Sequence, residues 1–221
     1  RLFAAMVSAM DDAVGAVLQK LREEKIEEQT LIVFLSDNGG PTAELTSSNA
    51  PLSGGKGSFL EGGLRVPFLV QWKGQLPAGK TFAHPVSSLD LAPTCLAATG
   101  APVSNRRDAA SQPNAGWTPA LRSLEGINLL PHLRGETPLP SRPLFWRMGR
   151  QAAMRDGYWK LLRTGDQPWQ LFNLATDPAE QTNLAAVKPV VVEQLAAAWT
   201  KWNQQNIPPL WGLPPGVRKQ P

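Results

Sequence analysis

Cysteine, tyrosine and histidine are scarce in this 221-residue chain, with one, one and two residues respectively. Because Cys95 is the only cysteine, no internal disulfide bond and no thiolate metal site can form. Apolar runs such as residues 31–35 are far shorter than the ~20 residues of a membrane-spanning helix, so we expect no membrane span. The 22 Lys and Arg residues are scattered among 18 Asp and Glu residues, a pattern that excludes the basic stripe of a nucleic-acid-binding protein.

Hydrophobic residues make up 42% of the chain, which is too much for a disordered coil and enough for a core. Residues 3–28 repeat apolar side chains at steps of three and four, which predicts a helix. Residues 31–35 are apolar without alternation, as in a strand covered on both faces. Together they predict an α/β layer, which an edge strand at 66–72 and a short helix at 90–99 extend.

The second half of the chain has a different pattern. Residues 101–142 are rich in proline, which predicts a linker or a wrapped loop. Short strand-like segments follow, separated by Asp-Gly and Gly-Asp steps that are typical of hairpins. They predict a small four-stranded antiparallel sheet packed on a closing helix, with strands at 144–148, 152–155, 158–163 and 169–174 and the helix at 190–203. We therefore predict three parts, at residues 1–100, 101–142 and 143–221.

Asp37 and Asn38 directly follow the predicted buried strand, at the end where ligands bind in open α/β sheets. A carboxylate beside an amide oxygen suits a hard divalent cation such as Ca²⁺ or Mg²⁺. The sequence Asp-Asn-Gly-Gly is also typical of a simple turn. Two ligands cannot complete a metal site, so both interpretations stay open at this point.

Lys56 lies among Gly54, Gly55 and Gly57, where the backbone can approach an anion closely and the lysine can supply a compact charge. Two phosphate-binding motifs are excluded by residue type. Gly57 stands where a P-loop has Ser or Thr, and Leu60 stands where a dinucleotide-binding loop has its third glycine. The spacing alone also fits a mobile surface lysine.

Few other residue types offer chemistry. We expect His84 and His132, which lie in predicted loops near proline, to be structural or solvated. We expect Cys95 to lie on the buried side of its short helix and to be inert.

Four sequence segments nevertheless follow one another along the chain in this order: LIVFLSDNGG, GGKGSFLEGGLRVPFLVQW, SSLDLAPTCLAATGAP and WQLFNLATDPAEQTNLA. Together they resemble the carboxyl-terminal half of type I sulfatases, the arylsulfatase-like branch of the alkaline phosphatase superfamily. The resemblance covers nearly the whole chain. It implies part of an alkaline-phosphatase-like sheet-and-helix layer followed by the small antiparallel sheet.

The resemblance also implies roles for individual residues. Asp37 and Asn38 would bind a divalent cation, calcium in this family. Lys56 would contact the sulfate and act in catalysis, where a highly charged transition state needs preorganised positive charge. Glu61, Gly62, Gly63 and Arg65 would shape the loop and supply structural charge pairing, without a part in the chemistry.

One element of the family is missing from the chain. The formylglycine nucleophile arises from a C/S-x-P/A-x-R string, and no such string occurs here. The resemblance therefore implies a sulfuric ester hydrolase whose nucleophile is supplied by an amino-terminal half. We expect this chain alone to be inactive.

Two alternatives remain: a phosphodiesterase or phosphonate hydrolase of the same superfamily, and a non-catalytic fragment that binds a partner. The partners that the resemblance implies are a sulfate-ester small molecule or a sulfated sugar. The apolar stripe of the first helix would be covered by the amino-terminal half or by self-association. The resemblance implies a periplasmic or secreted protein.

Overall fold

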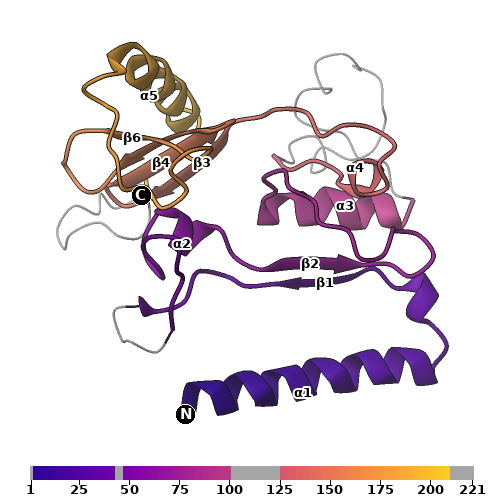
Figure 1. The fold of residues 1–221 in the computed structure, drawn as a ribbon. Helices are drawn as coiled ribbons and strands as arrows, with labels where there is room; N and C mark the ends of the chain where they lie inside the picture. The colour runs from indigo at the N-terminus through magenta and orange to yellow at the C-terminus, as the bar shows by residue number, and fades with distance from the viewer. Residues whose placement is uncertain (1, 43–46, 101–124, 210–221) are drawn as a thin grey trace, which may run out of the picture. The chain divides into compact units, whose positions relative to one another are not determined.

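The computed structural model describes residues 2–42, 47–100 and 125–209. The chain divides into two compact units. The first comprises residues 1–34 and 68–140, and the second comprises residues 35–67 and 141–221 (Figure 1). Residues 35–67, which carry the candidate site, thus group with the carboxyl-terminal sheet. The three predicted domain ranges stay a prediction.

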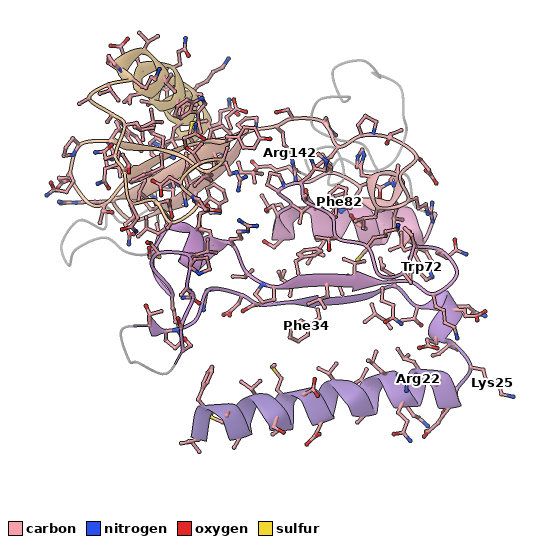
Figure 2. The ribbon with its side chains drawn as sticks, viewed as in Figure 1. Arg22, Lys25, Phe34, Trp72, Phe82 and Arg142 are labelled. Atoms are coloured by element: carbon pink, nitrogen blue, oxygen red, sulfur yellow. The ribbon has the colours of Figure 1, made fainter. Side chains whose placement is uncertain are left out.

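The first unit begins with a long helix, α1 (Leu2–Glu23), and a 3-10 turn, η1 (Glu27–Gln29). The predicted helix ran to residue 28. It ends earlier because Lys25 adopts a positive φ of 58°, which a right-handed helix does not allow. Trp72, labelled in Figure 2, donates its indole N–H to the carbonyl oxygen of Glu28 at 3.0 Å and so fixes the turn.

Strand β1 (Ile32–Leu35) pairs with β2 (Phe68–Gln71) in a two-stranded sheet. The two arrows run in opposite directions in Figure 1, and the backbone N–H of Ser36 donates to Pro67 O at 3.2 Å where the strands part. All four β1 side chains are partly exposed. The expectation of a strand covered on both faces was therefore wrong within the described ranges, since α1, which lies on one side of the sheet, buries none of its residues.

Helix α1 buries none of its residues. Among its apolar side chains, Leu2, Met6 and Val17 are 61–78% exposed. By length and composition it is the one helix in the described ranges that could cross a membrane. Core helices of soluble proteins and signal sequences meet the same criterion, so it does not assign α1 to a membrane. Phe34 of β1 points to the side of the sheet on which α1 lies (Figure 2).

The short helix α3 (Leu91–Ala98) is preceded by a 3-10 turn, η3 (Ser88–Asp90). Ser87 caps the turn in a reciprocal capping box with Asp90. Gly100 follows the helix with a φ of 74°, a conformation that is common just after a helix end. Cys95 is exposed, so its predicted buried position was wrong.

Residues 125–140 close the first unit, whereas predicted linker residues 101–124 lie outside the described ranges. The backbone N–H of Ile127 donates to the Asp90 carboxylate at 2.9 Å, and that of Leu129 donates to Thr94 Oγ1 at 2.9 Å. These bonds place Leu129 and Leu130 in the core, 1% and 4% exposed, before helix α4 (Leu130–Leu133). This end of the predicted linker or wrapped loop is therefore packed in the core.

The second unit is built on a four-stranded antiparallel sheet with strand order β3-β4-β5-β6. Gly157 and Gly165, in two of the connections, adopt φ angles of 57° and 60°, as the predicted hairpin steps require. Helix α5 packs against this sheet. The predicted antiparallel sheet and closing helix are confirmed: β3 (Leu144–Met148), β4 (Gln151–Asp156), β5 (Trp159–Arg163), β6 (Gln170–Asn173) and α5 (Pro189–Asn203). The unit also contains a four-residue turn of helix, α2 (Glu61–Leu64), which the sequence did not predict.

Both faces of this sheet are covered. Strand alternation sends Met154, Leu161 and Leu171 to the face that packs on α5. The intervening residues Ala153, Leu162 and Phe172 face the other way, and all three are 0–3% exposed. Their cover includes Phe59 and Leu60, which lie just beyond Lys56 in the chain. The small sheet therefore supports the segment that carries the predicted substrate lysine.

Candidate active site

The turn after β1 presents Asp37 and Asn38. Ser36 Oγ donates to Asn38 O at 2.8 Å, and Asn38 Nδ2 donates to Gly39 O at 2.9 Å. Because Nδ2 is engaged with the backbone, Oδ1 is the atom that Asn38 can offer to a cation. Asp37 is exposed and Asn38 is half-buried. The turn that the sequence predicts is therefore present, and it displays two oxygen donors.

The loop that carries Lys56 crosses this turn at backbone contact distance. The N–H of Gly39 donates to Gly63 O at 3.1 Å, and the N–H of Lys56 donates to Gly40 O at 3.2 Å. A Cβ atom at Gly39 would lie 1.7 Å from Gly62 O, so only glycine fits. The glycines of the two strings thus bring the cation-binding and anion-binding candidates together.

The side chain of Asn49 also connects the turn after β1 to the loop that carries Lys56. Its Nδ2 donates to Gly40 O at 3.1 Å and to Gly54 O at 3.0 Å. Its Oδ1 accepts from the N–H of Gly40 at 3.0 Å. Asn49 was not predicted as a residue of the site, because an isolated asparagine in a polar loop gives no sequence signal of these three hydrogen bonds.

Lys56 is exposed at the tip of its loop. The flanking Gly54 and Gly57 adopt φ angles of 76° and 82°, a conformation that other residues rarely adopt. The backbone at Lys56 is bonded to Gly40, whereas the residue itself is exposed to solvent. A fixed backbone with an exposed ammonium group suits anion binding better than a mobile surface lysine does.

The base of the Lys56 loop is held by a buried cluster of charges. Lys160 Nζ lies 2.8 Å from Glu61 Oε1 and 2.8 Å from Glu180 Oε1, and Arg155 reaches Glu61 Oε2 at 3.4 Å. The backbone N–H of Glu61 donates to Glu180 Oε2 at 2.5 Å. Two carboxylates and two cations thus compensate one another, which makes burial of Lys160 at 0% exposure tolerable.

The carboxyl group of Glu180 has a shifted pKa. Burial raises the pKa of its carboxyl group above the ordinary value, and the attraction of Lys160 and the bond from the Glu61 N–H oppose that rise. The expected structural charge pair of Glu61 is confirmed by its contact with Lys160. Lys160 and Glu180 were missed as its partners. Strand alternation was an available signal, because Lys160 lies two residues from Leu162 and therefore shares its inward face.

The donor set at the turn fits part of a cation site. Carboxylate and amide oxygens are the ligands that calcium and magnesium take. Within the described ranges, no group of three or more His, Cys, Asp or Glu residues could hold a metal ion. Asp37 and Asn38 could therefore supply two ligands, and the remaining ligands would come from elsewhere. His132 bonds to Thr137 and His84 packs on Phe82, as expected of structural histidines.

Residues 1–101 match the family model named Sulfatase. The chain is 37% identical over 137 residues to steryl-sulfatase of Mus musculus, covering 59% of this chain and 20% of the relative. It is 32% identical over 187 residues to N-acetylgalactosamine-6-sulfatase of Sus scrofa, covering 82% and 33%. The chain thus spans about a third or less of the length of these relatives.

Solved structures extend the likeness to the carboxyl-terminal unit. The crystal structure of Ps i-CgsB in complex with k-i-k-neocarrahexaose matches with a TM-score of 0.78 and 37% identity, over 94% of this chain and 44% of that one. Phosphonate monoester hydrolase of Agrobacterium radiobacter shares the fold, with a TM-score of 0.64 and 23% identity over 91% and 40%. The predicted fold class is confirmed by these matches. Residues 1–101 therefore belong to the sulfatase family by its model, and the relatives and solved structures extend the sulfatase likeness over most of the chain.

Proposed function

We propose that this chain contributes part of the active site of a sulfuric ester hydrolase. In this proposal Asp37 and Asn38 bind a divalent cation, calcium, and Lys56 binds the sulfate group of the substrate. The observation that carries the proposal is the hydrogen bond from the Lys56 N–H to Gly40 O, because it joins the lysine loop to the cation turn. Family membership supports the reaction type.

In this proposal, the cation held by Asp37 and Asn38 and the ammonium group of Lys56 act on the sulfate in different ways. A bound cation would polarise a sulfate oxygen. The ammonium group of Lys56 would offset negative charge that develops on the sulfate oxygens in the transition state. Asn38 Nδ2 keeps the amide oriented through its bond to Gly39 O. The formylglycine nucleophile would come from outside this chain, which contains no C/S-x-P/A-x-R string. We propose that the chain alone is inactive.

The sequence comparisons favour a sulfate ester over a phosphate or phosphonate ester as the proposed substrate. The relatives that match by sequence are sulfatases, whereas the phosphonate monoester hydrolase matches at 23% identity and so shares the fold alone. That fold likeness keeps a phosphonate or phosphate-ester hydrolase as the second candidate. The relatives act on chemically different sulfates by name, and a sulfated sugar or a small sulfate ester are both proposed substrates here. Secretion or a periplasmic location is likewise proposed from the family.

The deciding experiment joins the chain to the coding sequence upstream of Arg1 and assays the product on p-nitrophenyl sulfate and on a phenyl phosphonate ester. We expect sulfate hydrolysis from the joined protein, none from the chain alone, and a loss of at least about 100-fold in kcat/KM for Lys56→Ala. The matched control is Lys201→Ala on the exposed face of α5. Faster hydrolysis of the phosphonate would favour the second candidate, and turnover by the chain alone would overturn the proposed inactivity.

Cation binding has its own readout. Asp37→Asn in the joined protein should lower the calcium affinity measured by titration calorimetry, because it removes a charged oxygen ligand. Asp12→Asn, an exposed carboxylate on α1, should leave it unchanged. Equal calcium affinity of both variants and the parent protein would remove Asp37 from the cation site.

A further inference from the structure

The buried cluster of Lys160, Glu61, Glu180 and Arg155 lies at the base of the loop whose tip carries Lys56. Lys160 makes two contacts of 2.8 Å, one to Glu61 in the loop and one to Glu180 in the segment after β6. The three residues lie 99 and 20 positions apart in the sequence, so the contacts close long stretches of chain on one buried point. The cluster is therefore a cross-link between the sheet and the loop.

Backbone hydrogen bonds and apolar contacts of the loop connect this cross-link to Lys56. Glu61 is 4% exposed and opens the helical turn α2. The next residue, Gly62, donates its N–H to Ser53 O at 2.7 Å and so closes the loop at its base. Ser53 Oγ in turn donates to Ala179 O at 2.6 Å, beside Glu180. Four residues lie between Lys56 and Glu61, and the apolar anchors Phe59 and Leu60 are two of them.

A purely apolar anchor would hold the loop without the free-energy cost of burying charged groups. Burying an ammonium group costs free energy that its partners must offset, and apolar replacements of such clusters are often as stable. What ionic and hydrogen-bonded contacts add is direction, because Lys160 meets two carboxylates at defined oxygens while the Glu61 N–H meets a third atom, Glu180 Oε2. The cluster fixes the orientation of α2, and with it the path of the loop.

We propose that Lys160 and Glu180 are positioning residues that hold the Lys56 loop in the conformation competent to bind an anion. The proposal rests on the proposed function in one respect, the role of Lys56 toward sulfate. Neither Lys160 nor Glu180 touches substrate in this scheme, since both are buried under the loop. They act through Glu61 and the backbone bonds of the loop.

The first test measures amide hydrogen exchange by NMR on the chain itself, comparing the parent protein with Lys160→Met. Amides of the loop, at Lys56 and Gly62, should exchange at least 10-fold faster in the variant. Amides in the centre of the sheet, at Ala153 and Leu162, exchange through unfolding of the whole unit, so they should speed up only by the factor that corresponds to the variant's loss of unfolding free energy. Lys201→Met is the matched control. Equal acceleration at all four amides, or none at any, would overturn the positioning role.

The variant Glu180→Gln covers the case in which Lys160→Met does not fold. The amide keeps an oxygen for the Glu61 N–H and a similar size, so the sheet should form. Loop amides should then exchange several-fold faster than in the parent, with the sheet amides unchanged. Unchanged loop amides in this variant would exclude Glu180 as a positioning residue.

The second test separates the positioning role from the proposed function. In the joined protein, Lys160→Met should raise KM for p-nitrophenyl sulfate more than it lowers kcat, because the loop still samples the bound conformation. If the loop amides are released but neither Lys160→Met nor Lys56→Ala changes sulfate hydrolysis, the positioning role stands and the role of Lys56 fails. If Lys56→Ala alone impairs hydrolysis, Lys56 stands and the positioning role fails.

Discussion

Each of the two units contains a cluster of one lysine, one arginine and two glutamates, and the two clusters differ in how far their side chains are exposed to solvent. Lys160 and Arg155 meet Glu61 and Glu180 in the second unit, where Lys160 is fully buried. In the first unit Lys73 lies 3.2 Å from Glu27 and 3.6 Å from Glu28. Arg22 completes that cluster by reaching Glu27 at 3.4 Å. The side chains of Lys73 and Glu28 are 55% and 73% exposed.

The difference in solvent changes what each cluster does. At the surface, water and salt screen the charges, and a pair contributes little to stability. In the interior, each charge depends on its partners, and loss of one partner leaves another charge buried alone. The surface cluster therefore tethers the turn after α1 weakly, whereas the buried cluster fixes the loop of the candidate site.

The largest expected effect is on the stability of the second unit. Lys160→Met should lower the free energy of unfolding by about 3–5 kcal/mol, because Glu61 and Glu180 would remain buried with Arg155 as the one nearby cation. Urea denaturation followed by tryptophan fluorescence measures the change. A loss below about 1 kcal/mol would mean that water reaches the cluster and that the contrast with the surface cluster is wrong.

An intermediate effect should appear in the pH dependence of stability. Burial raises the pKa of Glu180 in the folded state, whereas in the unfolded chain the pKa keeps its ordinary value of 4.5. As the pH rises from 4.5 through the raised pKa, the unfolded state loses its proton first. The free energy of unfolding therefore falls over that window through this residue, and it is level below and above it.

Glu180→Gln isolates this contribution, because the amide does not titrate. The difference in unfolding free energy between the parent and the variant should fall as the pH rises through the window. Urea denaturation at a series of pH values measures it. A difference that rises with pH would show that the attraction of Lys160 outweighs burial.

The smallest effect should come from the surface cluster. Lys73 lowers the pKa of Glu27 through a side-chain hydrogen bond, so the stabilisation it gives is present above the ordinary carboxyl pKa and is lost as the pH falls through the lowered value. Lys73→Met should cause a small loss of stability at low salt that disappears at about 1 M salt. Lys80→Met, an exposed lysine of the same unit, is the control. A loss that persists at high salt would place Lys73 with the buried cluster.

Local patterns in the sequence were enough to predict the second unit's secondary structure. The Asp156-Gly157 step and the alternation on either side place β4 and β5 within one residue of their observed ends. These signals are local, because a hairpin needs a left-handed glycine and an alternating strand on each side. The α1 helix was predicted for the same reason, but its end was not, since the positive φ at Lys25 has no strong sequence signal.

Some predictions failed where burial depends on the rest of the fold. Helix α3 is apolar on most sides, so its pattern did not decide which face is covered, and Cys95 proved exposed. The strand at residues 31–35 was expected to be covered on both faces, but its burial depends on the elements that pack on the faces of its sheet rather than on its own residues. Periodicity reports a face only when polar and apolar residues alternate clearly.

The candidate site shows the same division. The sequence by itself determined the residue types at the turn and the loop, the glycines that their crossing requires, and through its four strings the sulfatase resemblance. The tertiary structure alone decided that the Lys56 backbone bonds to Gly40, that Asn49 bridges the crossing, and that Lys160 is buried between Glu61 and Glu180. The physical reason is the desolvation of charge: a lysine is buried only where carboxylates from distant parts of the chain converge on it, and the local sequence does not encode that convergence.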